Sequence, residues 1–273
     1  MVALSRPPVQ PESYPTDLSD FEWELLCPYV EVRAKTGPKR RVNLRAVLNA
    51  LRYKAKTGCQ WEMLPRSFPP KSTVHYYFQQ WTKKGIWVRI NDLLRRRVRR
   101  EVAGRENAEA SAGVIDTQSA KSSIAGGEER GYDGGKQVFG RKRHVLSDTG
   151  GLLITAVVHS ARLYDGEGAK QVFTATKARG ITLSKVWADQ TYRGALARWM
   201  ERNGMGELEI VTRQPGQRGF VVQARRWVVE RTHAWLSGNR QLSREYDHNP
   251  RHSESWLYLA SIRLLGRRLA KAS

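Results

Sequence analysis

The pattern of apolar residues changes once along this chain, at the small and polar residues 104–111. Before this stretch, apolar residues recur at intervals of three and four positions, which is typical of amphipathic helices. After it, short apolar runs alternate with turn sequences and further helical patterns, which is typical of a sheet covered by helices. We therefore predict an all-α domain over residues 1–105 and an α/β domain over residues 106–273.

The first domain is predicted to contain four short helices. Capping residues open the first three, and a proline or a glycine follows each of them. These boundary pairs are Ser19 and Pro28, Asn43 and Gly58, and Ser72 and Gly85. A fourth helix after Gly85 carries an apolar stripe and ends in a run of arginines. Short helices with a basic loop and a polar face are typical of helix-turn-helix-like DNA-binding modules, although a helical charge run is as often a solvated face.

The net charge of the chain indicates what kind of molecule it binds. The chain carries 47 lysine and arginine residues against 26 aspartate and glutamate residues, a formal net charge of +21. Such an imbalance points to a phosphate backbone or an anionic membrane surface. No apolar run reaches the roughly 18 residues of a membrane span, and the N-terminus lacks a secretory signal pattern, so we expect a cytoplasmic, nucleoid-associated protein. Cys27 and Cys59 are too few for a disulfide framework and are not spaced for zinc.

The second domain is predicted to begin with three antiparallel strands. The first contains Val114 and Ile115, and the next two form a hairpin around Asp148-Thr-Gly-Gly151. The remaining predicted elements are a helix over 165–177, a strand over 185–188, a helix through Leu196 and Trp199, a strand over 208–212, and helices over 222–237 and 254–269. This order is that of a ribonuclease-H-like fold. In such a mixed sheet flanked by helices, the parallel strands lie centrally and functional groups collect at their C-terminal ends.

Three acids form the candidate site: Asp116 and Asp189 each end a predicted strand, and Glu230 lies in a helical pattern. Carboxylate oxygens are the ligands that Mg²⁺ prefers. Two Mg²⁺ ions about 3.5–4 Å apart can activate a nucleophile and stabilise the leaving oxygen in phosphodiester chemistry. Taken singly, each aspartate is more simply a turn or helix cap, and Glu230 a surface ion pair with Arg226 or Arg231. Together the acids predict a carboxylate site for divalent metal that acts on nucleic acid.

Eight short motifs occur in order between about Tyr14 and Leu269. They are Thr57-Gly-Cys-Gln-Trp, Leu64-Pro-Arg-Ser-Phe-Pro-Pro, Ser72-Thr-Val-His-Tyr-Tyr-Phe, Ile115-Asp-Thr-Gln-Ser, Gly131-Tyr-Asp-Gly-Gly-Lys, Gly140-Arg-Lys-Arg-His, Trp187-Ala-Asp-Gln-Thr-Tyr and Arg226-Trp-Val-Val-Glu-Arg-Thr. The chain resembles, in these motifs, the bacterial insertion-sequence transposases of the DDE type, in particular the insertion sequence five family. The resemblance implies a transposase that binds the terminal inverted repeats of its element, cuts at the element ends and joins the freed 3′ ends to target DNA with Mg²⁺, or with Mn²⁺ in its place. A homodimer is implied as well, because two element ends must be brought together.

The resemblance assigns the role of metal-binding triad to the three acids named above. Arg226 matches an arginine that the family places four residues before the glutamate. The basic residue expected after the glutamate is replaced by Ser237, with Arg240 as the nearest base, and the upstream tyrosine by Gln223 or a neighbour. Two alternatives stay open: a ribonuclease-H-like, metal-dependent nuclease that cuts without joining, and an inactive DNA-binding regulator derived from a transposase.

Basic and polar side chains near these motifs are the predicted DNA contacts. They are Lys39, Arg40, Arg41, Lys71, Ser72, His75, Lys136, Arg141, Lys142, Arg143, Arg193, Arg226 and Arg240. For the run from Arg141 to Arg143, the alternative is a charged, solvated strand edge. His159 and His233 are predicted to be structural rather than metal ligands, because Mg²⁺ does not seek imidazole. A further hypothesis for Tyr192 and Trp199 is stacking on a flipped base.

Overall fold

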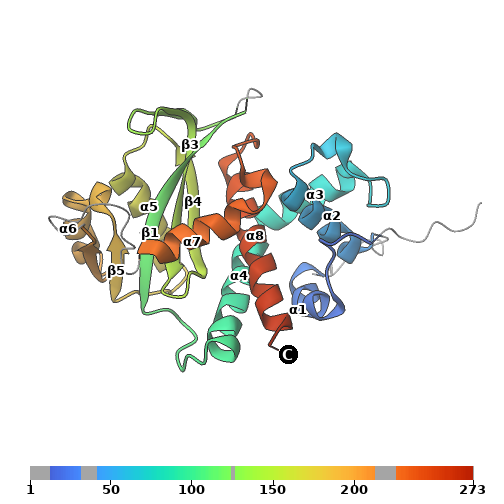
Figure 1. The fold of residues 1–273 in the computed structure, drawn as a ribbon, viewed down its shortest axis with the longest axis horizontal. Helices are drawn as coiled ribbons and strands as arrows, with labels where there is room; N and C mark the ends of the chain where they lie inside the picture. The colour runs from blue at the N-terminus through green and yellow to red at the C-terminus, as the bar shows by residue number, and fades with distance from the viewer. Residues whose placement is uncertain (1–12, 32–41, 124–126, 213–225, 273) are drawn as a thin grey trace, which may run out of the picture.

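The computed structural model describes residues 13–31, 42–123, 127–212 and 226–272, and its helical and sheet-containing parts lie side by side (Figure 1). The helical part contains α1 (Asp20–Val30), α2 (Leu44–Thr57), α3 (Lys71–Lys83) and α4 (Ile86–Arg97). A short 3-10 helix, η1 (Trp61–Met63), precedes α3, and α4 continues as a π-helical turn, η2 (Val98–Val102). The predicted basic loop with Lys39, Arg40 and Arg41 lies outside the described residues. None of the helices in the described ranges is both long and apolar enough to cross a membrane.

Local sequence signals set most helix ends. Ser19 forms the predicted capping box: its hydroxyl accepts from the Glu22 amide, and the Glu22 carboxylate accepts from the Ser19 amide, both at 3.1 Å. Asn43 caps α2 through its side-chain oxygen. Gly58 ends the same helix at a φ of +67°, in the left-handed conformation that glycine favours. These predicted boundaries are confirmed.

Two predicted boundaries are wrong, and both involve proline. Helix α1 does not stop near Pro28 but runs to Val30, whose side chain is buried. A proline this close to a helix C-terminus removes a single backbone hydrogen bond, and the packing of Val30 offsets that loss. Helix α3 begins at Lys71 rather than after a Ser72 cap, because Pro70 already occupies the N-cap position.

Within the described residues, one mixed sheet contains β1 (Ala112–Lys121), β2 (Gly131–Asp133), β3 (Val138–Asp148), β4 (Leu153–Ser160), β5 (Lys185–Ala188) and β6 (Glu207–Ile210). Its order is β2-β3-β1-β5-β6, with β4 also paired to β3. Strand β3 is antiparallel to β1, β2 and β4, whereas β5 is parallel to β1 and β6 to β5. The predicted hairpin is confirmed as β3 and β4, but the short β2 was not predicted. Strand β1 continues to Lys121, so Asp116 lies inside the strand rather than at its predicted end.

Different helices cover the two faces of the sheet. Successive residues of a pleated strand point to opposite faces. Ile115 of β1 belongs to the apolar core beneath α5 (Asp165–Lys177) and α6 (Ala195–Arg202), and Val114 to the core on the other face. Figure 1 shows α7 (Arg226–Ser237) running across β1, and it packs on the second of these faces.

Helix α8 (Pro250–Ala270) packs on β4 on one side and on the helices of the helical part on the other (Figure 1). The Trp256 ring of α8 stacks on Phe78 of α3, with ring centroids 4.3 Å apart. Asn91 of α4 donates to the Leu153 carbonyl of β4 at 2.9 Å and so ties the helical part to the sheet. The helical part and the sheet therefore pack against each other. The division of the chain into two domains near residue 105 stays a prediction from the sequence.

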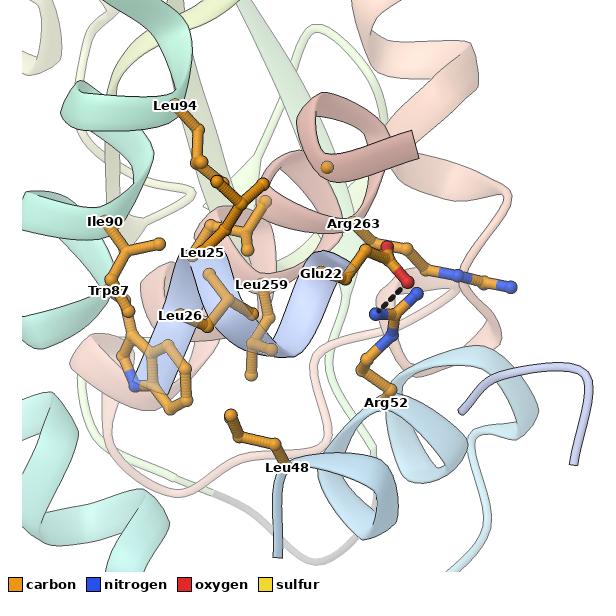
Figure 2. Close-up of a pocket in the computed structure, with 12 residues that line it drawn as sticks. Glu22, Leu25, Leu26, Leu48, Arg52, Trp87, Ile90, Leu94, Leu259 and Arg263 are labelled. Atoms are coloured by element: carbon orange, nitrogen blue, oxygen red, sulfur yellow. Dashed lines mark ion pairs between the residues drawn. The ribbon is translucent and has the colours of Figure 1, made fainter. Parts of the chain in front are cut away.

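A cavity of about 20 Å³ lies between α1, α2, α4 and α8 (Figure 2). Beside it, Glu22 and Arg52 form an ion pair at 3.0 Å in which both side chains are buried. The rest of the lining is mostly apolar and includes Trp87 and Leu259. Such a volume holds about one water molecule, so the cavity is too small for a ligand.

Candidate metal-binding site

The parallel pairing of β1 with β5 places two acids at matching positions. Val114 of β1 lies opposite Trp187 of β5, an offset of 73 residues, and the same offset separates Asp116 from Asp189. Adjacent strands of a sheet are about 4.8 Å apart. The two aspartates therefore lie on neighbouring backbone segments where β5 ends, at the edge where functional groups of parallel strands collect.

Helix α7 brings the third acid and a histidine over this edge. Asp116 shares its face of β1 with Val114, which is the face that α7 covers. His233 of α7 places its Nε2 atom 3.5 Å from Asp116 Oδ2. Glu230 lies one helical turn before His233 and is exposed. Across the described ranges, no three His, Cys, Asp or Glu side chains converge as a metal-ligand group, so the predicted triad is not gathered.

Contacts with the β3–β4 turn hold α7 in place. Thr232 Oγ1 donates to the Gly151 carbonyl at 2.9 Å, and Arg231 Nη2 donates to the Gly150 carbonyl at 3.0 Å. Gly151 has a φ of +79°, and a Cβ atom there would meet Thr232 Oγ1 at 3.0 Å. The turn that the sequence predicts therefore also anchors the helix that carries Glu230.

The loop after β5 fixes the backbone at Asp189. Its Oδ1 atom accepts from the Thr191 amide at 2.9 Å and also from the Thr191 hydroxyl. Asp189 is thereby the N-cap of a 3-10 helix, η3 (Gln190–Tyr192). The capping interpretation of this acid is correct, and it holds the carboxylate at the end of β5.

Tyr192 lies beneath the acids and corrects one hypothesis. Its ring is fully buried with its edge toward His144, so it cannot stack on a flipped base. Burial raises the pKa of its hydroxyl well above the usual value, and the negative charges of Asp116, Asp165 and Asp189 raise it further. This concentration of negative charge, with hard oxygen donors inside β1 and directly after β5, fits a divalent cation held by Asp116 and Asp189.

The other proposed stacking residue, Trp199, is half-buried on α6 and packs against the core beneath α5.

The basic run on β3 is internal, which corrects the prediction that it contacts DNA. Arg141 and Arg143 are only 1% and 2% exposed, and both pair with the buried carboxylate of Glu245. Lys142 pairs with Asp165 of α5 at 2.8 Å. These side chains are buried because α5 covers one face of β3 while the segment between α7 and α8 covers the other. Arg141 and Arg143 hold that segment on the sheet, Lys142 holds α5, and none of the three faces solvent.

Three of the other predicted DNA contacts are exposed, and two of them, Lys136 and Arg193, lie near the acids. Lys136 donates from Nζ to the carbonyl of Thr117, the residue after Asp116, at 3.1 Å. Arg193 directly follows η3, and Arg240 lies shortly after α7. Arg226 opens α7, but its side chain lies outside the described residues.

In the helical part, α3 presents the exposed polar surface. Lys71 and Ser72 are exposed in its first turn, and Lys71 pairs with Glu62 at 2.8 Å. His75 is half-buried with its ring edge against Trp61, and burial lowers its pKa. Helix α4, in contrast, is buried between α8 and the sheet. Of these two consecutive helices, α3 is therefore the one with an exposed polar surface.

Two contacts of the site region were not predicted. The first is that His233 faces Asp116. The sequence feature that could have indicated this contact is the position of His233 one helical turn after Glu230 on the same helix. Glu245 is the shared partner of two arginines, and no sequence signal links it to Arg143, which lies 102 residues earlier.

Comparison with known families agrees with this architecture. A family described as "Putative transposase of IS4/5 family" matches residues 18–91, and the transposase DDE domain family matches residues 107–265. No curated protein matches the chain. The second match covers more than half of the sequence and includes all three acids. The resemblance seen in the sequence motifs is confirmed: this chain belongs to the DDE transposases of the IS4/5 insertion-sequence family.

Proposed function

We propose that this protein moves its own insertion sequence: it binds the terminal inverted repeats, cuts at the element ends and joins the 3′ ends to target DNA. The observation that carries the proposal is the matching placement of Asp116 and Asp189 on parallel strands beneath the helix of Glu230. The sheet supports a ribonuclease-H-like fold for the catalytic part, because β1 to β4 pair antiparallel while β5 and β6 follow in parallel beside β1.

The three acids have distinct tasks in this proposal. Asp116 and Asp189 would hold Mg²⁺ or Mn²⁺ between neighbouring strands, and Glu230 would complete the site from α7. Bound divalent cations would supply an activated attacking oxygen and stabilisation of the leaving 3′ oxygen. Thr191 orients Asp189 through its amide and hydroxyl, and the β3–β4 turn orients Glu230 through α7.

Basic side chains outside the core would hold the DNA. Near the acids these are Lys136, Arg193 and Arg226. Arg240 lies beside Gly58 at the end of α2, and the helical part adds Lys71 and Ser72 of α3 with Lys39, Arg40, Arg41 and His75. The net charge of +21 supports binding of a phosphate backbone. A homodimer would bring two element ends together, and action on chromosomal DNA implies a cytoplasmic, nucleoid-associated protein.

A strand-transfer assay tests this function. The full chain is incubated with Mg²⁺, a terminal-repeat duplex ending in a 3′ hydroxyl, and a target plasmid. Joined products support the transposase, whereas cutting without joining supports the nuclease alternative. Binding without either reaction supports the inactive regulator.

A further inference from the structure

His233 presents a buried nitrogen to Asp116 without forming a hydrogen bond. Its Nε2 atom lies 3.5 Å from Asp116 Oδ2, and N–H···O bonds are about 2.7–3.2 Å long. Within the described part of the chain, this nitrogen has no hydrogen-bond partner, and its side chain is only 12% exposed. Buried polar atoms are nearly always paired in native proteins, so the two facing atoms point to a third group between them.

The separation of the two atoms matches a shared metal ion. Nitrogen and oxygen donors lie about 2.0–2.2 Å from a divalent transition metal. Two donors that subtend about 90–110° at the ion are therefore about 3.0–3.5 Å apart, as geometry requires. The Nε2 to Oδ2 distance of 3.5 Å falls at the upper end of that range.

Regular structure fixes both donors. Asp116 lies inside β1, where it pairs with Val145 of β3, and His233 lies within α7. Val229 and Leu236 of α7 are buried, and Thr232 bonds to the β3–β4 turn. Donors on a strand and a helix are held more precisely than donors on loops, so a site here would be preformed.

We propose that Asp116 Oδ2 and His233 Nε2 are two donors to one divalent cation, an inference that rests on the proposed metal-dependent function. A neutral imidazole suits transition metals, whereas Mg²⁺ prefers oxygen ligands. The position therefore favours Mn²⁺ over Mg²⁺. The prediction that His233 is structural assumed Mg²⁺, and it does not hold for a metal that accepts nitrogen.

Electron paramagnetic resonance of Mn²⁺ tests the inference without any reaction. Free Mn²⁺ is titrated against the full chain, and spin-echo modulation detects nitrogen bound to the ion. The wild type is expected to show nitrogen coupling that His233→Phe loses while His248→Phe keeps it, since His248 is exposed. The affinity for Mn²⁺ is expected to fall at least about tenfold in His233→Phe, because losing a direct donor should cost no less than losing a residue that only supports one.

Asp116→Asn separates this inference from the proposed function. If Asp116→Asn abolishes Mn²⁺ binding but His233→Phe leaves affinity and nitrogen coupling unchanged, the metal site stands and the role of His233 is wrong. If neither variant changes Mn²⁺ binding, or if the wild type binds none at millimolar concentration, both fail. His233→Gln repeats the test with a side chain that keeps polarity but supplies no imidazole, and thermal unfolding confirms that each variant is folded.

Discussion

Arg143 and Glu245 form an ion pair in the interior, with side chains only 3% and 1% exposed. The pair joins β3 to the segment between α7 and α8, and Arg141 shares the same carboxylate. Removing one member of a buried pair leaves an uncompensated charge and costs about 3–5 kcal/mol. Glu245→Gln is therefore expected to lower the free energy of unfolding by this amount in urea titrations followed by tryptophan fluorescence. Glu207→Gln, which breaks an exposed pair with Lys185, should cost under about 1 kcal/mol, and equal losses in the two variants would contradict the interior role.

Asp116→Asn is expected to abolish cutting and joining while leaving binding of the terminal repeat unchanged. The asparagine keeps the shape of the side chain but removes the charge that would hold a divalent cation. Loss of several kcal/mol of metal stabilisation corresponds to at least about a hundredfold slower strand transfer. The matched control is Asp20→Asn, an exposed carboxylate in the helical part. If Asp116→Asn carried out strand transfer at the wild-type rate, the assignment of Asp116 as a metal ligand would be wrong.

Lys136→Ala is expected to weaken DNA binding at every sequence and to reduce its salt dependence. Lys136 is exposed, and its ammonium donates to the carbonyl of Thr117, the residue that follows Asp116. Losing one phosphate contact should reduce the slope of log affinity against log salt by about 0.9. Lys177→Ala removes the same charge at the end of α5 away from Asp165, and its slope should stay at the wild-type value. Filter binding between low and moderate salt measures the slope for each variant. Identical slopes would show that Lys136 does not contact a DNA phosphate.

Glu254 of α8 should make stability fall as pH rises through the acid range. Its carboxylate accepts from the Val158 amide at 3.0 Å, and burial raises its pKa from 4.5 to about 7. Between these two values the folded chain keeps a proton that the unfolded chain has released. The unfolding free energy therefore declines as pH rises across this window, by up to about 3 kcal/mol, and levels off above it.

Glu254→Gln isolates this contribution, because the amide oxygen can still accept from Val158 but does not titrate. The difference in unfolding free energy between wild type and variant is expected to change from pH 4.5 to 7 and to stay constant above pH 7. Urea titrations at five pH values measure it. A difference that is flat across the whole range would show that Glu254 has an ordinary pKa.

Local chemistry explains which parts of the fold were predictable from the sequence. The Ser19 capping box, the Gly58 helix end and the β3–β4 turn depend on residues a few positions apart, and the structure confirms them. Continuation of α1 past Pro28 depends instead on the packing of Val30, which no local pattern reveals.

The site shows the same division. Each aspartate could be placed on a strand because apolar residues precede it, but the register that aligns them depends on the pairing of strands 73 residues apart. The basic run on β3 is buried because Glu245, about a hundred residues later, pairs with its arginines. From the charge of the run alone, we predicted that these residues lie on the surface. The alignment of the two aspartates and the burial of the basic run therefore depend on contacts between residues far apart in the sequence, which hydrophobic periodicity does not reveal.

Helix α8 has a consequence for how the protein is made. It packs on α3 and α4, yet it begins about 150 residues after α4 ends. Until the ribosome has translated α8, the side chains of Phe78 and Trp87 lack part of the packing that buries them in the complete fold. During that time they are accessible to chaperones and proteases. A stop codon near residue 250 would therefore delete only α8 from the chain, yet it would also leave α3 and α4, at the opposite end of the sequence, without part of their packing.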